Sequence, residues 1–294
     1  MEVRKLAQVW SKNLGTLHTN PVVCSLKRAN VKTTPRTPTH THTRIPAKYS
    51  SPRLESFPKL GASALAICGD LTQRGKRSEF RAARDWLDRF DLPKLVVAGN
   101  HDTPLLNLYE RVVSPFDRHD DYFADLSGPV ELDSAILVGM NTARGWQTRS
   151  NWAEGSVNLE DLESAIADAH APEMAGKTSF LICHHPFLSP PDAPLRTATK
   201  RGRRASRRLT QSKVGFLLTG HVHAPSVTVV DHKDDAYVAV SSGTLSTRLR
   251  EHPASFNVID LAADACRVTV HNLHGDRFVP AKPHTLAPHF GQPE

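Results

Sequence analysis

The sequence has few cysteines, no long apolar runs and, before position 70, no aspartate. Its four cysteines form no CxxC pair, and Cys68 and Cys183 each lie inside an apolar run. This pattern predicts buried free thiols in a reducing compartment, so the expected localisation is cytoplasmic. No window approaches 18 consecutive apolar residues, so no segment is expected to span a membrane.

The net charge of +7 is unevenly distributed. Residues 1–60 hold eleven Lys and Arg against two acids, Glu2 and Glu55. The remaining residues hold 26 Lys and Arg against 28 Asp and Glu. The basic character therefore belongs to the N-terminal segment, and the pI alone does not indicate a nucleic-acid-binding protein.

Residues 1–60 are rich in Thr, Ser and Pro and show no sustained hydrophobic period, although residues 20–26 could form a short strand. We expect this basic segment to be mostly disordered or loosely attached. A transit peptide is one interpretation, because such peptides are basic, rich in hydroxyl groups and poor in acids. The other is that the segment is not the natural start of the protein.

From about residue 62, short apolar runs alternate with amphipathic stretches, and a series of strands follows. This order predicts an α/β fold with a mixed or second sheet, in one domain over residues 61–278 with a frayed tail at 279–294. Helices are expected at 77–90, at 103–113 with Thr103 as its cap, and at 158–170 with Asn158 as its cap. Strands are expected at 64–69, 94–99, 135–141, 178–183, 214–220, 226–232, 236–243, 255–261 and 266–273.

Four of these strands end in residues that commonly bind metals. In open α/β sheets, ligands bind beyond the carboxyl ends of the strands, so the four clusters should meet in one crevice. The clusters are Gly69-Asp70, the GNHD motif with Asn100, His101 and Asp102, the HHP motif with His184 and His185, and the GHVH motif with His221 and His223.

The order GDxxxxG, GNHD, HxP and GHxH resembles that of the calcineurin-like metallophosphoesterases, over residues 62–275. Within that superfamily, residues 241–261 are similar to the bacterial cyclic-nucleotide-phosphodiesterase-like branch. The resemblance implies a two-sheet β-sandwich flanked by helices. It also implies hydrolysis of a phosphodiester, such as a cyclic nucleotide, by a metal-activated hydroxide.

The family carries two divalent metal ions, and mixed nitrogen and oxygen ligands suit manganese, iron or zinc. By resemblance, Asp70 bridges both ions, while Asn100 and His221 bind the second ion. His184 is preferred to His185 as a further ligand of that ion because it lies two residues before proline, but the choice between them stays open. His223 would bind the first ion.

The resemblance also gives roles to two further residues of the GNHD motif. His101 would act as proton donor or charge stabiliser beside the leaving-group oxygen. Asp102 would orient the His101 ring through a hydrogen bond.

The chain departs from the family in its first motif, an Asp-x-His that supplies two ligands of the first metal. No aspartate precedes Asp70, and His40 and His42 offer imidazoles only. The first ion would therefore keep only Asp70 and His223. Three explanations stay open: a misassigned start or shifted reading frame that replaces the original first strand, true loss of the motif, or substitution by a distant residue such as His40 or His42. If the motif is lost, the protein is a catalytically impaired relative that binds one metal or a phosphate as a sensor or scaffold.

Other candidate residues lie outside the motifs. Arg248 and Arg250, in the loop after a core strand, and Asn141, at a strand end, are candidate substrate contacts, although Asn141 could equally form a cap or turn. Residues 196–213 carry eight basic residues, which fit a solvated helix better than a steering rim. They lack the aromatic residues of a single-strand nucleic-acid platform, so nucleic acid is only weakly supported as a partner. The resemblance implies a small phosphate ester or nucleotide as the substrate. The oligomeric state stays open.

Overall fold

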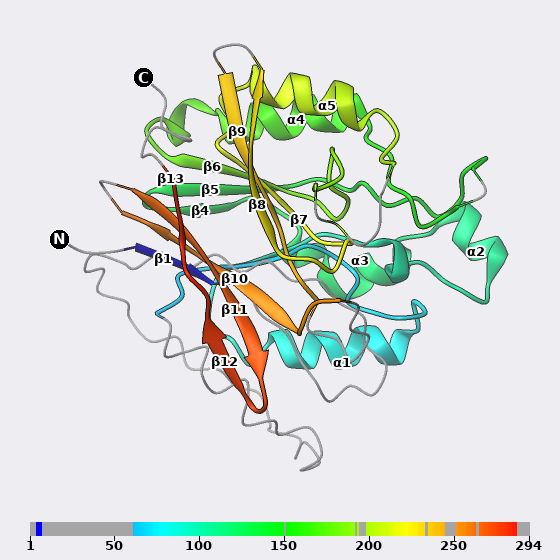
Figure 1. Cartoon of the computed structure of the whole chain (residues 1–294). Coiled ribbons are helices and arrows are strands. Elements are labelled where there is room, and N and C mark those ends of the chain that lie inside the picture. The colour runs from blue at the N-terminus through cyan, green and yellow to red at the C-terminus, as the bar shows by residue number, and fades with distance from the viewer. Residues whose placement is uncertain are drawn as a thin grey trace.

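The structure is a computed structural model that describes residues 4–7, 61–149, 151–191, 193, 198–232, 235–244, 251–262 and 265–286. Two sheets face each other across an apolar core, and helices lie on the outer side of each (Figure 1). The expected α/β fold, a two-sheet sandwich flanked by helices, is confirmed. Within the described ranges, no helix combines the length and apolar character needed to cross a bilayer.

The larger sheet has six strands, in the order β4-β5-β6-β7-β9-β8. β5, β6, β7 and β9 are parallel, whereas β4 and β8 pair antiparallel at the two edges. Its outer face is covered by two helices, α4 (Leu159–Ala169) and α5 (Gly202–Thr210) (Figure 1). The strands are β4 (Val130–Leu132), β5 (Ala135–Gly139), β6 (Thr178–Ile182), β7 (Phe216–Thr219), β8 (Ser226–His232) and β9 (Asp235–Ser241).

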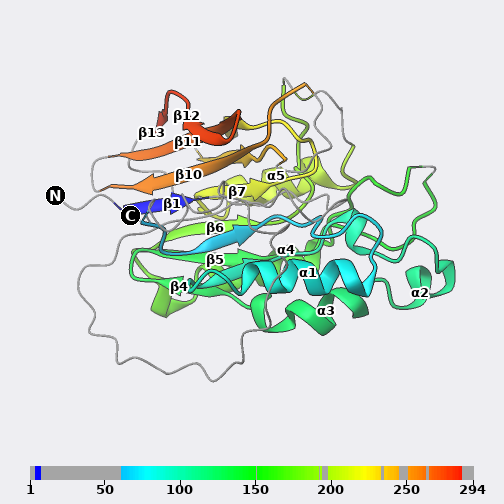
Figure 2. The ribbon, with the colours of Figure 1, turned by 90° about the horizontal axis from the view of Figure 1, so that it is seen from below.

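The second layer combines an antiparallel sheet with a parallel pair of strands. β1 (Arg4–Ala7), β10 (Ser255–Leu261), β11 (Cys266–His274) and β12 (Arg277–Pro280) lie in that order, and β13 (His284–Leu286) also pairs with β11. Figure 2 shows β10, β11 and β12 together on one side of the molecule. Strands continue to Leu286, so β-structure extends into the tail expected from residue 279.

The parallel pair, β2 (Leu65–Ile67) and β3 (Lys94–Val96), carries the first two motifs. Helices α1 (Arg77–Leu87) and α3 (Asp117–Phe123) pack on this side through Phe80, Leu87 and Phe123. The remaining short helices are η4 (Asn100–Asp102), α2 (Leu108–Val113), η5 (Ala124–Leu126) and η6 (Pro172–Met174).

Alternate residues of the central strands face different layers. Leu137, Phe180 and Phe216 join the core between the sheets, whereas Ile136 and Leu181 pack under α4 and α5. Both faces of these parallel strands are therefore buried, which explains why their sequences are continuous apolar runs. This packing holds the carboxyl ends of the strands at one edge of the molecule.

The helix expected at 103–113 begins later than the sequence predicts. Asn107 is the cap, because its side-chain oxygen accepts a hydrogen bond from the Glu110 N–H at 3.1 Å. Thr103 instead donates its hydroxyl to the Asn100 carbonyl at 2.9 Å. Thr103 therefore ties the strand-end turn together and does not start the helix. The cap predicted at Asn158 is confirmed by its 3.1 Å contact with the Glu160 N–H.

The core between the sheets yields the first prediction. Phe180 and Phe216 are fully buried, with ring centroids 4.7 Å apart. Phe216→Ala is expected to lower the free energy of unfolding by about 3–5 kcal/mol, because it removes buried surface and leaves a cavity. Urea denaturation measures this change. Val229→Ala, on the exposed part of β8, is the control; equal losses for both variants would contradict the assignment of this core.

Candidate metal centre

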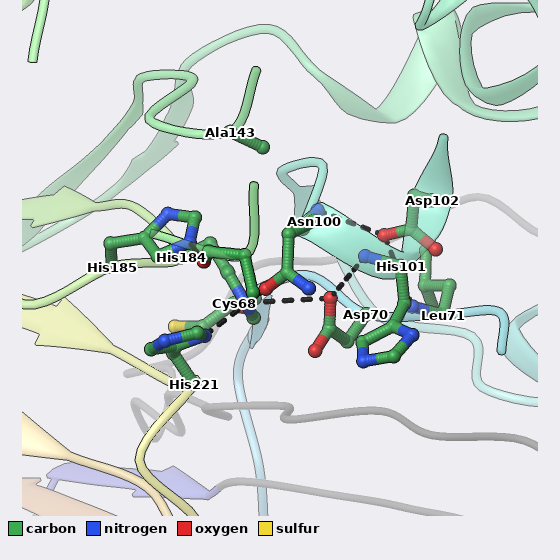
Figure 3. A network of polar contacts seen from close by, with 12 residues as sticks. Cys68, Asp70, Leu71, Asn100, His101, Asp102, Ala143, His184, His185 and His221 are labelled. Carbon is green, nitrogen blue, oxygen red and sulfur yellow. Dashed lines mark hydrogen bonds and ion pairs between the residues drawn. The ribbon is translucent and has the colours of Figure 1, made fainter. Parts of the chain in front are cut away.

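The four strand-end clusters meet at one edge of the sheets. Asp70 follows β2, Asn100 and His101 follow β3, His184 follows β6, and His221 follows β7. Figure 3 shows the side chains of Asp70, Asn100, His184 and His221 pointing toward one another. A cavity of about 330 Å³ opens above them, and Asp70, Asn100, His101, His221 and His223 line it together with Gln73, Thr103, Leu105, Arg111 and Ala153.

The His184 ring has one proton position fixed by the fold. Its Nδ1 lies 2.7 Å from the Cys68 carbonyl oxygen. A carbonyl only accepts hydrogen bonds, so Nδ1 carries the hydrogen and Nε2 of the neutral ring presents a lone pair. That Nε2 faces Asn100 Oδ1 at 3.1 Å and Asp70 Oδ1 at 3.4 Å. When the ring is neutral, three acceptor atoms face one another, an arrangement that a cation between them stabilises.

The spacing of these atoms fits a metal ion. His221 Nδ1 also lies 3.1 Å from Asn100 Oδ1, so two imidazoles converge on one amide oxygen. Bonds of about 2.1 Å to one ion place neighbouring ligand atoms about 3.0 Å apart at a right angle and about 3.4 Å apart at a tetrahedral angle. The distances of 3.1 to 3.4 Å match this range. The donor set of imidazole, amide and carboxylate suits a first-row transition metal.

His184 and His185 differ in what their rings contact. His184, His185 and His221 form a buried cluster whose ring nitrogens lie within 4.8 Å of one another. Both nitrogens of His185 have protein partners: Nδ1 lies 3.0 Å from Thr142 Oγ1 and Nε2 lies 2.9 Å from the Ala153 carbonyl. Burial and the adjacent His184 hold the pKa of His185 well below its usual value. The contacts of His185 therefore support the ring cluster, while Nε2 of His184 faces the carboxylate and the amide.

Asp70 is 2% exposed, yet it lies among groups that favour its charged form. Burial raises the pKa of its carboxyl, but His184 and His101 and the backbone N–H of His101 outweigh burial, so the pKa is lowered. The backbone N–H of His101 donates to Asp70 Oδ1 at 3.0 Å. His223 also lowers the pKa of Asp70, so the pair lies within electrostatic reach.

Three of the predicted ligands have left-handed backbone conformations. The φ angles of Asp70, His221 and His223 are 58°, 66° and 59°. Non-glycine residues rarely adopt this region, and such strain of about 1–3 kcal/mol each gathers at functional sites. The sequence gives no signal for these angles because none of the three residues is glycine or asparagine.

Asp102 does not contact the His101 ring, which corrects the role expected for it. Its carboxylate accepts hydrogen bonds from the backbone N–H groups of Leu71, Thr72 and Gly99, at 2.8 to 3.1 Å, and from the Thr72 hydroxyl. Burial and the charge of Asp70 raise the pKa of Asp102. Asp102 therefore joins the turn after β2 to the turn after β3.

The His101 ring is placed by a different group. Its Nδ1 lies 3.0 Å from the Gln73 carbonyl, and the ring lines the cavity. The two turns approach so closely that a Cβ atom on Gly99 would lie 2.2 Å from Asp70 Oδ1. Glycine at position 99 is therefore required for Asp70 to face the histidines.

Of the three remaining candidates, Asn141 is the one that the structure describes, and it is not among the residues that line the cavity. Asn141 Oδ1 accepts a hydrogen bond from the Ala143 N–H at 2.8 Å, which fits the turn interpretation. Arg248 and Arg250 lie outside the described residues. Arg111 and Gln73, which line the cavity, were missed because neither belongs to a motif.

The hydrogen bonds of Asp102 give the second prediction. Asp102→Asn places an amide N–H₂ against N–H donors, and each buried donor left without an acceptor costs about 1–3 kcal/mol. The free energy of unfolding and the metal affinity should both fall. Denaturation and equilibrium dialysis of metal measure them, with Asp85→Asn on the exposed face of α1 as the control. An unchanged free energy of unfolding and metal affinity for Asp102→Asn would show that the two turns keep their arrangement without this carboxylate.

Comparison with solved structures finds 36 matching chains. A dimetal phosphatase from Danio rerio has a TM-score of 0.54 at 12% identity, covering 80% of this chain and 86% of that one. The GAP50 anchor of the inner membrane complex of Plasmodium has a TM-score of 0.34 at 13% identity, covering 54% and 52%. The first shows a shared fold, and the second is too distant to support an argument. No curated protein sequence matches.

Comparison with protein families gives a match over the part of the chain that holds the site. The calcineurin-like phosphoesterase family matches residues 53–225, which include Asp70, Asn100, His184, His221 and His223. This match covers more than half of the chain. The chain therefore belongs to the calcineurin-like phosphoesterase family.

Proposed function

We propose that this chain is a metal-dependent phosphoesterase that hydrolyses a phosphodiester. The observation that carries the proposal is the convergence of His184 Nε2 and His221 Nδ1 on Asn100 Oδ1, each at 3.1 Å, beside the buried carboxylate of Asp70. Family membership supports the reaction class.

The proposed metal ligands fall into two sets, one for each ion. Asp70, Asn100, His184 and His221 would hold one ion, and Asp70 with His223 would contribute to a second. Divalent ions bound there neutralise phosphate charge and lower the pKa of water toward neutrality. The Cys68 carbonyl accepts from Nδ1–H of His184, so the neutral ring would offer its Nε2 lone pair to the metal.

His101 is the group proposed to act on the leaving oxygen. Its ring lines the cavity, and Nδ1–H donates to the Gln73 carbonyl at 3.0 Å. This bond directs the other ring nitrogen away from Gln73. A protonated Nε2 there would donate to the oxygen that gains negative charge as the ester bond breaks.

The finer choice of substrate rests on the sequence. Residues 241–261 are similar to the cyclic-nucleotide-phosphodiesterase-like branch, so a cyclic nucleotide is the first substrate to test. Arg248 and Arg250 remain proposed contacts to its phosphate. The cavity accommodates a small ester, in line with its volume of about 330 Å³.

A second candidate function is that of a single-metal or phosphate-binding protein without turnover. Two observations favour it. The buried cluster of His184, His185 and His221 includes two of the ligands proposed for the second ion, and the residues before Asp70 contain no aspartate to complete the first site. Two metal ions per chain with hydrolysis of bis-p-nitrophenyl phosphate would support the enzyme, whereas one ion without hydrolysis in Mn²⁺ would support the binding protein.

The third prediction separates metal binding from proton donation. Asn100→Ala and His221→Ala should each abolish hydrolysis of bis-p-nitrophenyl phosphate and lower the metal content, because each removes a proposed ligand. His101→Ala should leave the metal content nearly unchanged and lower kcat by about 10²–10⁴-fold. Metal analysis of the purified variants and steady-state kinetics measure both.

His232→Ala, on the exposed end of β8, is the matched control and should behave as the unmodified chain. Loss of metal from His101→Ala would show that this ring is a ligand and would overturn its proposed role.

A further inference from the structure

Arg111 lies beside the proposed metal centre although no motif contains it. It belongs to α2, is 7% exposed and lines the same cavity as Asp70, Asn100 and His101. Its guanidinium lies over the Trp152 ring, with Cζ 5.7 Å from the ring centroid. Among the described residues that line this cavity, Arg111 is the only lysine or arginine.

The Arg111 hydrogen bonds use only part of the guanidinium. Nε donates to the Gly145 carbonyl at 2.8 Å, and Nη1 donates to the Pro104 carbonyl at 3.3 Å. A guanidinium carries five N–H donors in a fixed plane. No described residue accepts from Nη2, so its two N–H groups are not used by the described part of the protein.

No carboxylate in the described part of the chain pairs with Arg111. Its protein contacts are two neutral carbonyls and the Trp152 ring. A buried charge that has no counter-ion is costly, and arginine is the side chain best suited to bind a phosphate through parallel N–H bonds. Asp70, the carboxylate in the cavity, faces the histidines of the proposed metal centre.

The loop that fixes Arg111 also approaches α2 closely. A Cβ atom on Gly145 would lie 2.0 Å from the Arg111 carbonyl oxygen. The Gly145 carbonyl can therefore reach Arg111 Nε only because position 145 has no side chain. This contact directs the guanidinium before any ligand arrives.

We propose that Arg111 is a substrate-binding residue whose guanidinium donates through Nη2 to a non-bridging oxygen of the substrate phosphate group. The inference rests on the proposed function, because metal bound at Asp70, Asn100, His184 and His221 would place the phosphate in this cavity. Arg111 would neutralise charge on the phosphate from the side of α2 and orient it for attack. Because Arg111 belongs to α2, which Asn107 caps, the position of this helix would then affect which substrates the site binds.

A purely structural arginine would anchor α2 to the loop around Gly145 and would affect stability alone. Arg144 provides a matched comparison, because its guanidinium is also partly buried and donates to a carbonyl, that of Ala143, at 3.0 Å. Arg144 does not line the cavity. Removing its charge should change stability without changing phosphate binding.

The experiment measures binding of inorganic phosphate to the Mn²⁺-loaded full chain by isothermal titration calorimetry. Arg111→Gln should weaken phosphate binding on the order of tenfold to a hundredfold, because hydrogen bonds to charged groups are lost. Arg111→Lys keeps the positive charge but not the planar set of N–H donors, and its phosphate affinity should fall about tenfold. Arg144→Gln should bind phosphate as the unmodified chain does. Metal content is measured for every variant.

Kinetics with bis-p-nitrophenyl phosphate supply a second readout, in which KM should rise for Arg111→Gln and Arg111→Lys. If Arg111→Gln fails to fold, Arg111→Lys alone decides the matter. Unchanged phosphate affinity in a folded, metal-loaded Arg111 variant would overturn the proposal. Phosphate binding that depends on Arg111 in a chain without hydrolysis would support the proposal and overturn only the proposed enzymatic function.

Discussion

The buried carboxylate of Asp70 is the constraint on which the rest of the site depends. A charged group with 2% exposure is unfavourable unless cationic or hydrogen-bonding groups surround it. Asp70 lies at the end of β2, and the turns after β3, β6 and β7 bring His101, His184 and His221 around it. The arrangement of the two sheets explains this meeting, because both faces of the central strands are packed and their carboxyl ends lie at one edge.

Two features hold the turns in place without contacting substrate. Asp102 accepts hydrogen bonds from both strand-end turns, and Gly99 lets the turns approach within a distance that any side chain would prevent. The left-handed φ of Asp70 needs this support, because an isolated turn would relax it. Metal binding and loop stability are therefore coupled through the same residues.

The sequence predicted the positions of the clustered residues well, because strand-end glycines and histidines are visible in a single chain. It did not predict what each side chain contacts. The bond from His184 to the Cys68 carbonyl joins residues that are distant in sequence. Asp102 binds the backbone of the turn after the neighbouring strand β2, not the His101 ring as its motif suggested. α2 starts later than expected because Asn107, and not Thr103, caps the helix. Arg111 was missed because a single arginine on a short helix has no pattern to distinguish it.

The most direct test of the account is a crystal structure of the full chain grown with Mn²⁺, with anomalous diffraction data that locate the ion. The account predicts an anomalous peak bounded by Asn100 Oδ1, His184 Nε2 and His221 Nδ1, with Asp70 beside it and the His185 ring still bonded to Thr142 and Ala153. A peak at His185, or the absence of any peak among these residues in Mn²⁺-saturated crystals, would contradict it.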